Sequence, residues 1–243
     1  MTLMDKRAFS AFPKEGLQFL RSLKRNNNRE WFQKHRGNYE EHVKQPMSDL
    51  IEALHADFQK FAPEMTASPK VSAYRIYRDT RFSKDKSPYK THVAAVFPRR
   101  GLDKHEGAGF YVHIATDELL VGGGLYMPLP EDLSAVRTHI FENSRKFVSI
   151  VENKAFRRTF GELGGEQLTR VPRGFPAESP VADYLRHKQF LAGRNLPPEL
   201  ATTSRFYKTL LDTYRAMLPL IRFLDDPIVR TRRAKDRQDH FFI

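Results

Sequence analysis

The sequence predicts an α+β fold, in which an antiparallel β-meander of about four or five strands is flanked by N-terminal and C-terminal helices. Apolar residues recur at helical spacing over roughly the first 62 residues and again after Pro130. Between Pro69 and Pro128 the chain changes to short runs rich in β-branched and aromatic residues, separated by turn residues.

The N-terminal part is predicted to be helical throughout. In "PKEGLQFLRSLKRNNN", Leu17, Leu20 and Leu23 share one helical face; three asparagines end that helix, and Asn28 can cap the next one. That next helix, "REWFQKHRGNYEEHVKQ", reaches Pro46, which restarts or kinks it. An amphipathic helix follows, whose apolar face is Met47, Leu50, Ile51, Leu54, Phe58 and Phe61.

Four segments are predicted to form the meander: "KVSAYRIYRD", "YKTHVAAVFPRR", "GAGFYVHIAT" and "ELLVGGGLYMP". After Pro130 further helices are expected, with "QFLAGRNLP" as an extended segment and a long final helix that starts near Thr203 or Ser204. We therefore predict one domain over residues 1–226 and a basic, flexible tail over residues 227–243, which carries five Lys or Arg and two Asp.

Composition limits the class of protein. The 243 residues contain no cysteine, which excludes disulfides and thiolate metal sites. No apolar run has the length of a signal peptide or a membrane span, so a cytoplasmic protein without a membrane partner is expected. The formal net charge of +12 is basic enough to suggest an anionic partner, either a small molecule or a nucleic acid, and a generally basic composition without such a partner is an equal alternative.

The familiar catalytic signatures are absent. The chain has no G-x-S-x-G, P-loop, G-x-G-x-x-G or H-E-x-x-H motif. The nine histidines are scattered without metal-ligand spacing, although His105 and His113 with Glu106 could in principle hold an ion. We therefore predict neither a metal nor a cofactor.

Two further motifs each allow two interpretations. The glycines of "VGGGLYMP" can mark close packing on the sheet or a backbone cradle for a phosphate, and packing is the preferred interpretation. In "RVPRGFP", Pro172 and Pro176 stiffen a loop that carries Arg170 and Arg173. These arginines can recognise an anion or pair with an acid of the protein itself.

The most informative stretch is "RIYRDTRFSKDKSPYK", residues 75–90, where six cations accompany two acids. Residues 64–105 hold ten Lys or Arg and four acids, so half of the net charge lies on about a sixth of the chain. If the segment enters as a strand, Tyr74 and Ile76 point to the core, whereas Arg75, Tyr77 and Asp79 share the opposite face.

We predict an anion-binding site here. The expected ligand-binding residues are Arg75, Arg78, Arg81, Lys86, Lys90 and Arg173, with Tyr77 and Tyr89 as aromatic surface. Nucleic-acid binding by basic residues interleaved with aromatic ones is the first alternative. A hydrolase or transferase acting on a phosphorylated substrate is the second, with Asp79, Asp85 or Tyr77 as catalytic candidates. Asp79 is expected to stay ionised among the arginines, which makes it a poor general base. A charged hairpin held by its own ion pairs is the structural alternative.

The motifs "NNNREWF", "RIYRDTRFSKDKSPYKTH", "GGGLYMP" and "PRGF…SPVADYLRHKQF" together resemble a widespread bacterial family, with fungal and plant relatives, known as a domain of unknown function. The resemblance extends from about Phe12 to Asp226 and implies one domain, but it implies no activity, cofactor or ligand.

Overall fold

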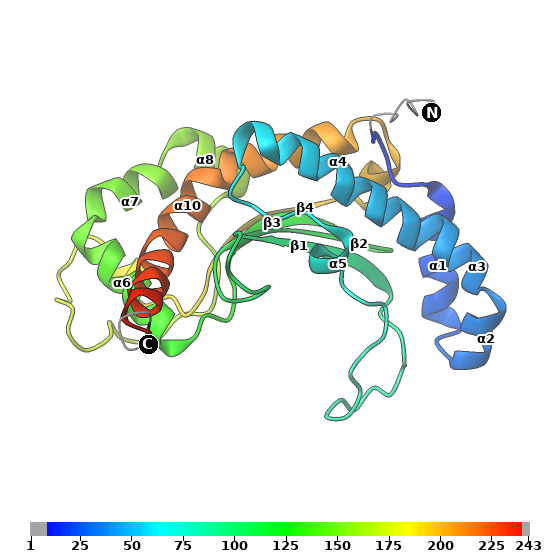
Figure 1. Cartoon of the computed structure of the whole chain (residues 1–243), viewed down its shortest axis with the longest axis horizontal. Helices are drawn as coiled ribbons and strands as arrows, with labels where there is room; N and C mark the ends of the chain where they lie inside the picture. The colour runs from blue at the N-terminus through cyan, green and yellow to red at the C-terminus, as the bar shows by residue number, and fades with distance from the viewer. Residues whose placement is uncertain (1–8, 240–243) are drawn as a thin grey trace. The chain divides into compact units, whose positions relative to one another are not determined.

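The α+β class is confirmed by the four-stranded sheet of the computed structural model, which describes residues 9–239. Its strands are antiparallel and follow the order β1 (His92–Pro98), β2 (Gly109–Ala115), β3 (Leu119–Leu125) and β4 (Phe190–Leu196) (Figure 1). The extended segment predicted at "QFLAGRNLP" is therefore the fourth strand of the sheet.

The first segment of the predicted meander is not a regular strand, and this part of the prediction was wrong. Residues Pro69–Ser72 form the short helix α5, and only isolated antiparallel bridges follow, Ala73 with Ala95 and Tyr77 with Tyr89. Four positions separate Ala73 from Tyr77, whereas six separate Tyr89 from Ala95. The extra residues on one side interrupt the ladder, as in a β-bulge.

The N-terminal helices form as the apolar spacing predicts. They are α1 (Lys14–Arg25), α2 (Arg29–Lys34), α3 (Arg36–Tyr39), the π-helical turn η1 (Glu40–Lys44) and α4 (Gln45–Phe61). Pro46 is the second residue of α4 and directly follows the π-helical turn η1, so the chain stays helical there but its hydrogen-bond register changes, in line with the predicted restart or kink. Of the apolar face predicted for α4, the five residues Met47, Leu50, Ile51, Leu54 and Phe58 are buried.

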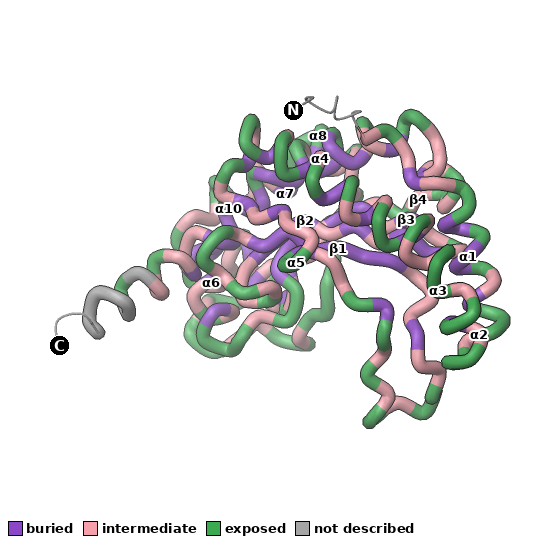
Figure 2. Tube along the Cα trace, turned by 45° about the vertical axis from the view of Figure 1, so that its right-hand side comes forward, coloured by how far each residue is buried: buried purple, intermediate pink, exposed green. Residues whose placement is uncertain are grey.

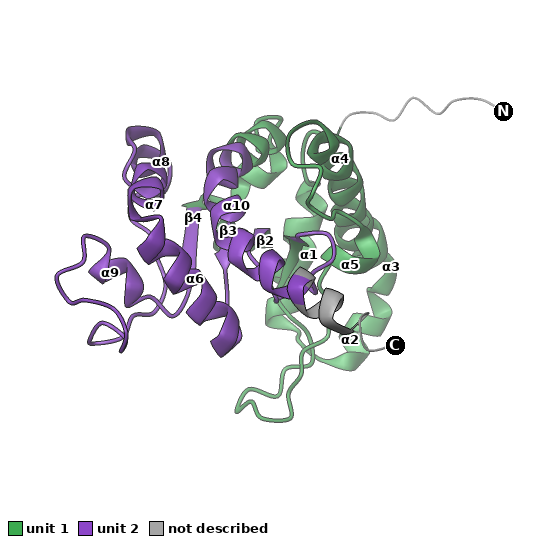
Figure 3. Cartoon of the chain, turned by 60° about the vertical axis from the view of Figure 1, so that its left-hand side comes forward, with its two compact units in different colours: residues 1–97, 111–121, 195–212 green, residues 98–110, 122–194, 213–243 purple. Residues whose placement is uncertain are grey.

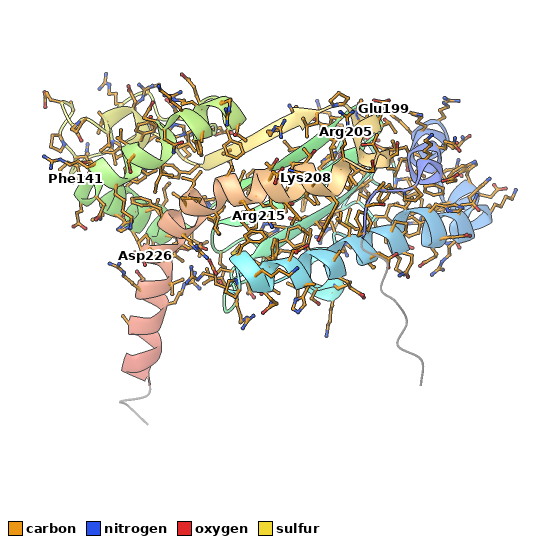
Figure 4. All side chains as sticks on the ribbon, turned by 90° about the horizontal axis from the view of Figure 1, so that it is seen from above. Phe141, Glu199, Arg205, Lys208, Arg215 and Asp226 are labelled. Carbon is orange, nitrogen blue, oxygen red and sulfur yellow. The ribbon has the colours of Figure 1, made fainter. Side chains whose placement is uncertain are left out.

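The remaining helices lie between β3 and the C-terminus. They are α6 (Pro130–Glu142), α7 (Ser144–Val151), α8 (Lys154–Phe160), α9 (Ala182–Leu185), the 3₁₀ turn η2 (Pro198–Thr202) and α10 (Phe206–Asp239). Arg215 and Asp226, both labelled in Figure 4, lie on α10.

The described chain divides into two compact units, coloured separately in Figure 3. Unit 1 comprises residues 1–97, 111–121 and 195–212, and unit 2 comprises residues 98–110, 122–194 and 213–243. The prediction of a single domain stays a prediction, and each unit is described by itself.

The core of unit 1 lies between its helices and its share of the sheet. Phe58 of α4 packs edge-on against Phe97 of β1, with ring centroids 5.4 Å apart. The backbone N–H of Phe12 donates to the carbonyl of Ala201 at 2.8 Å, which ties the segment before α1 to η2. Figure 2 shows the buried residues of these elements in purple.

In unit 2, the three consecutive glycines of β3 are explained by the close approach of neighbouring backbone. A Cβ at Gly123 would overlap the carbonyl oxygen of Gly109, and one at Gly124 would overlap that of Phe190. Gly124 also has φ +125°, a conformation that side chains strongly disfavour. The glycines therefore allow close packing, as the preferred interpretation expects, because neighbouring backbone occupies the space that side chains would need.

The boundary predicted at residue 227 does not coincide with a change in the structure. Helix α10 continues through Pro227 as far as Asp239, and Ile228 is fully buried. Arg232 donates to Glu106 at 3.0 Å and to Asp132 at 3.3 Å. The predicted tail is thus packed helix at Ile228 and Arg232, and residues 240–243 lie outside the described range.

Candidate functional site: a basic loop on unit 1

Residues 75–90, here called the basic loop, project from unit 1 between α5 and β1 (Figures 1 and 3). Backbone hydrogen bonds join the two arms at the base of the loop, from the N–H of Lys90 to the carbonyl of Ile76 at 2.7 Å and from that of Arg78 to the carbonyl of Pro88 at 2.9 Å. The base is therefore ordered although no regular strand forms there.

The two arms still alternate between inward and outward side chains. Ile76 is 6% exposed and belongs to the core, whereas Arg75, Tyr77 and Asp79 are exposed, as the strand parity predicts. Tyr74 is only half-buried, so the expected inward pair reduces to Ile76 alone.

Both acids of the loop are engaged by arginines of the loop. Arg81 binds Asp79, with Nη2 and Oδ2 2.8 Å apart, and Arg78 binds Asp85. Hydrogen bonds from Arg81 lower the pKa of Asp79 to about 2, and hydrogen bonds from Ser87 and Arg78 lower the pKa of Asp85. The prediction that Asp79 stays ionised among the arginines is thus supported. A carboxylate with so low a pKa is a weak base at neutral pH, so neither acid is suited to general-base catalysis.

The other four cations of the loop are not paired in this way. Arg75, Lys84, Lys86 and Lys90 have no carboxylate within 4 Å among the residues that the structure describes. Lys86 donates to the carbonyl of Thr80 at 3.0 Å, and Lys90 lies over the ring of Tyr74, 5.0 Å from its centroid. The loop's own ion pairs therefore neutralise only a third of its cations. A charged hairpin held by its own ion pairs would need carboxylate partners for most of them.

Two of these four cations, Arg75 and Lys90, lie in the two arms at the base of the loop. Partial burial lowers the pKa of Lys90, and the charge of Arg75 lowers it further. Besides the hydrogen bonds from Arg81, which binds Asp79, the charge of Arg75 also lowers the pKa of that carboxylate. Like charges near each other repel, and an anion bound between Arg75 and Lys90 would relieve that repulsion. Among the residues predicted to bind a ligand, Lys90 is therefore a cation whose pKa is lowered by burial and by a second cation of the loop.

Arg75 and Lys90 belong to a larger group of polar side chains. The sequence interpretation did not assign four of its half-buried members to the site: Tyr74, His92, Tyr111 and His113. We name the sheet-face cluster by its members: Tyr74, Arg75, Lys90, His92, Tyr111 and His113. Tyr111 and His113 of β2 alternate with buried residues of that strand and so share one face. The ring of Tyr74 lies 6.4 Å from that of Tyr111.

The two histidines of the sheet-face cluster stack across neighbouring strands. Their ring centroids are 4.1 Å apart with an angle of 22° between the planes. Burial, the neighbouring His113 and the charge of Lys90 together lower the pKa of His92 to about 4, so its ring is neutral at pH 7. His113 lies between Tyr111, whose hydroxyl is 3.3 Å from Nδ1, and Glu118, 3.7 Å from Nε2. The spacing of two along a strand is the sequence signal that could have grouped Tyr111 with His113.

Aromatic rings support the base of the loop from α2 and α3. Phe32 stacks on Tyr89 at 4.1 Å, and Tyr77 lies 5.4 Å from Tyr89 and 6.4 Å from Phe32. Tyr39 lies 5.3 Å from Phe32; burial and the neighbouring Glu40 and Tyr77 raise its pKa to about 12. Of the two tyrosines predicted as ligand-contacting surface, Tyr77 is 47% exposed, but Tyr89 is 2% exposed and belongs to the core. The role predicted for Tyr89 is therefore corrected to support of the loop.

The three consecutive asparagines have separate tasks. Asn26 ends α1, and Asn28 caps α2 by accepting from the N–H of Trp31 at 2.9 Å, as predicted. Between them, Asn27 donates to the carbonyl of Tyr89 at 2.9 Å and accepts from its N–H at 3.1 Å. "NNNREWF" and the basic loop, far apart in the sequence, are thus hydrogen-bonded to each other.

The chain matches one family model over residues 15–223, described as "Conserved hypothetical protein (DUF2461)". The chain belongs to this family. The match includes the basic loop, the asparagines and the glycine-rich strand, and it agrees with the resemblance seen in the sequence. Comparisons with curated proteins and with solved structures found no match.

The predicted site residue Arg173 belongs to unit 2. Both Arg173 and Arg170 are exposed, in the loop that precedes α9.

Among the residues described, no helix has the length and apolar character needed to cross a membrane. Within the same residues, no group of three or more His, Asp or Glu side chains is arranged to hold a metal ion.

Proposed function

We propose that this protein binds an anionic, phosphate-bearing ligand at the base of the basic loop. The observation that carries the proposal is the pair Arg75 and Lys90: burial and the charge of Arg75 lower the pKa of Lys90, and neither cation has a carboxylate within 4 Å among the described residues. Guanidinium and ammonium groups are the usual ligands of phosphate oxygens.

The neighbouring groups support this ligand class. His92 is neutral and lies next to Lys90, so it can donate or accept a hydrogen bond without adding like charge. The basic loop as a whole has six cations and two acids, a net charge of +4, which attracts an anion over a longer range. Asp79 and Asp85 hold Arg81 and Arg78 in place through ion pairs and are weak bases at neutral pH. Catalysis on a phosphorylated substrate stays a prediction.

Isothermal titration calorimetry with pyrophosphate tests the proposal. The variants Arg75→Gln and Lys90→Gln should each weaken binding about tenfold or more, since a charge-assisted hydrogen bond contributes about 1.5–3 kcal/mol. Lys14→Gln, which removes an exposed cation at the start of α1, outside the basic loop, is the matched control for net charge.

Circular dichroism and thermal unfolding of each variant separate loss of binding from loss of fold. If the wild-type protein does not bind pyrophosphate, or if all three variants bind it equally, Arg75 and Lys90 do not form a phosphate site. A large fall in the melting temperature of Arg75→Gln would instead make that arginine structural.

A further inference from the structure

We propose that the tip of the basic loop, residues 79–86, is a contact surface for single-stranded nucleic acid, on which Phe82 stacks against a base. The tip uses residues other than Arg75 and Lys90, so this proposal and the phosphate site at the base can fail independently.

Phe82 lies where it can contact a partner but does not pack in the core. It is 95% exposed, and the next most exposed large apolar residue described, Met127, reaches 65%. A side chain with almost its whole surface in water contributes little to the core of unit 1. Burying the ring against a partner would be favourable, because it removes a large apolar area from water.

The surroundings of Phe82 are cationic. The guanidinium of Arg81 lies 5.7 Å from the ring centroid, and Lys84 and Lys86 follow within four residues. Asp79 and Asp85 are taken up by arginines, so the lysine charges remain available to a partner. Cations around an exposed ring fit a polyanion whose bases offer flat aromatic faces.

Tyr77 provides a second ring on the arm that leads to the tip. Phe32 and Tyr89 support it from behind, at 6.4 Å and 5.4 Å, while 47% of its surface remains exposed. Such support restricts the side chain before a ligand arrives, which lowers the entropy lost on binding. Two exposed rings separated by cations are the pattern of a stacking surface for unpaired bases.

A lipid surface fits the tip less well. Membrane attachment grows with the apolar area that enters the interface, and the tip offers one apolar ring among Thr80, Ser83, Lys84 and Asp85. Duplex DNA also fits less well, because its bases are already stacked on one another and leave no face free for Phe82.

Fluorescence anisotropy with a labelled oligo(dT) strand tests the proposal. Phe82→Ala should weaken binding about tenfold, since it removes one stack between a base and an aromatic ring, and Phe82→Trp should restore it. The double variant Lys84→Gln/Lys86→Gln should lower the slope of log affinity against log salt by about 1.4, or about 0.7 for each phosphate that is no longer neutralised. The control Phe141→Ala removes an exposed phenylalanine of α6 in unit 2 (labelled in Figure 4) and should leave binding unchanged.

Three outcomes would overturn the proposal. They are a flat salt response, equal affinity of the wild type and Phe82→Ala, and preference for duplex over single strand. Phe82-dependent binding to phosphatidylserine vesicles without oligo(dT) binding would assign the tip to a membrane surface instead. Pyrophosphate titration of Phe82→Ala should match the wild type, so failure at the tip is distinguishable from failure at the base.

Discussion

Asn27 and Tyr89 are joined by two hydrogen bonds, in which the side-chain amide of Asn27 pairs with both backbone polar groups of Tyr89. An amide side chain used in this way imitates the pairing of a neighbouring strand. It connects the turn between α1 and α2 to the arm of the basic loop that leads into β1, at a point where the regular ladder is interrupted.

Asn27→Ala should therefore loosen the loop. Both polar groups of Tyr89 lose a partner in a partly buried environment, so the free energy of unfolding should fall by about 1–3 kcal/mol in urea titrations. Hydrogen exchange should show faster exchange of the Tyr89 amide. The control Asn26→Ala removes one exposed hydrogen bond, to Ser22, and should cost less. Equal effects of the two variants would contradict the role given to Asn27.

Arg232 should stabilise unit 2, although it lies in the basic C-terminal run. Its guanidinium bonds Glu106 and Asp132, and Asp132 is only 2% exposed. Burial already raises the pKa of Asp132, and Arg232 opposes that rise. Arg232→Met should leave a buried carboxylate without its cation and lower the free energy of unfolding by about 3 kcal/mol.

The matched control for that variant is Arg230→Met. Arg230 pairs with Asp226 at 2.6 Å, but its side chain is 70% exposed, so its loss should change stability by less than about 1 kcal/mol. Similar small effects of both variants in urea unfolding would mean that the end of α10 contributes little to the fold.

His92 should make unit 1 less stable in acid. Its pKa is about 4 in the folded protein and 6.5 by itself, so the unfolded chain binds the extra proton first as the pH falls. Stability associated with His92 is therefore present above pH 6.5 and decreases progressively between pH 6.5 and 4. His113 and Lys90, which face the ring, add to this resistance to protonation.

His92→Gln should remove this contribution. Between about pH 7 and 4, the free energy of unfolding should fall by about 1–2 kcal/mol less in the variant than in the wild type. The expected difference is smaller than the full pKa shift implies, because the ring is partly solvated. Urea unfolding at a series of pH values measures the difference. His55→Gln, at an exposed histidine of α4, is the control, and parallel pH curves for wild type and His92→Gln would refute the prediction.

Several features of the site follow from neighbours in the sequence and could be predicted. Asn28 caps α2 through a residue three positions away, and Asp79 is held ionised by Arg81 two positions away. Ile76 and Arg75 point to opposite sides because alternation is a property of any extended backbone. Such interactions depend on the spacing within one segment, which the sequence displays directly.

The features that could not be predicted all depend on which distant segments meet. Tyr89 looks like an exposed aromatic of a charged loop, yet Phe32 and Asn27, about sixty residues away, bury and bind it. His92 and His113 carry no metal-like spacing and come together only because β1 and β2 are neighbours.

The sequence by itself therefore determined the α+β class, the helical faces, the caps and the density of charge in residues 75–90, since each rests on local spacing. Only the tertiary structure decided that "QFLAGRNLP" is the fourth strand and that helix α10 continues past Pro227, where Arg232 pairs with Glu106 and Asp132. It also decided that four of the six cations of the basic loop have no carboxylate partner within the described part of the chain. Those outcomes depend on pairing between remote segments, where many partners satisfy the same local pattern and packing selects one.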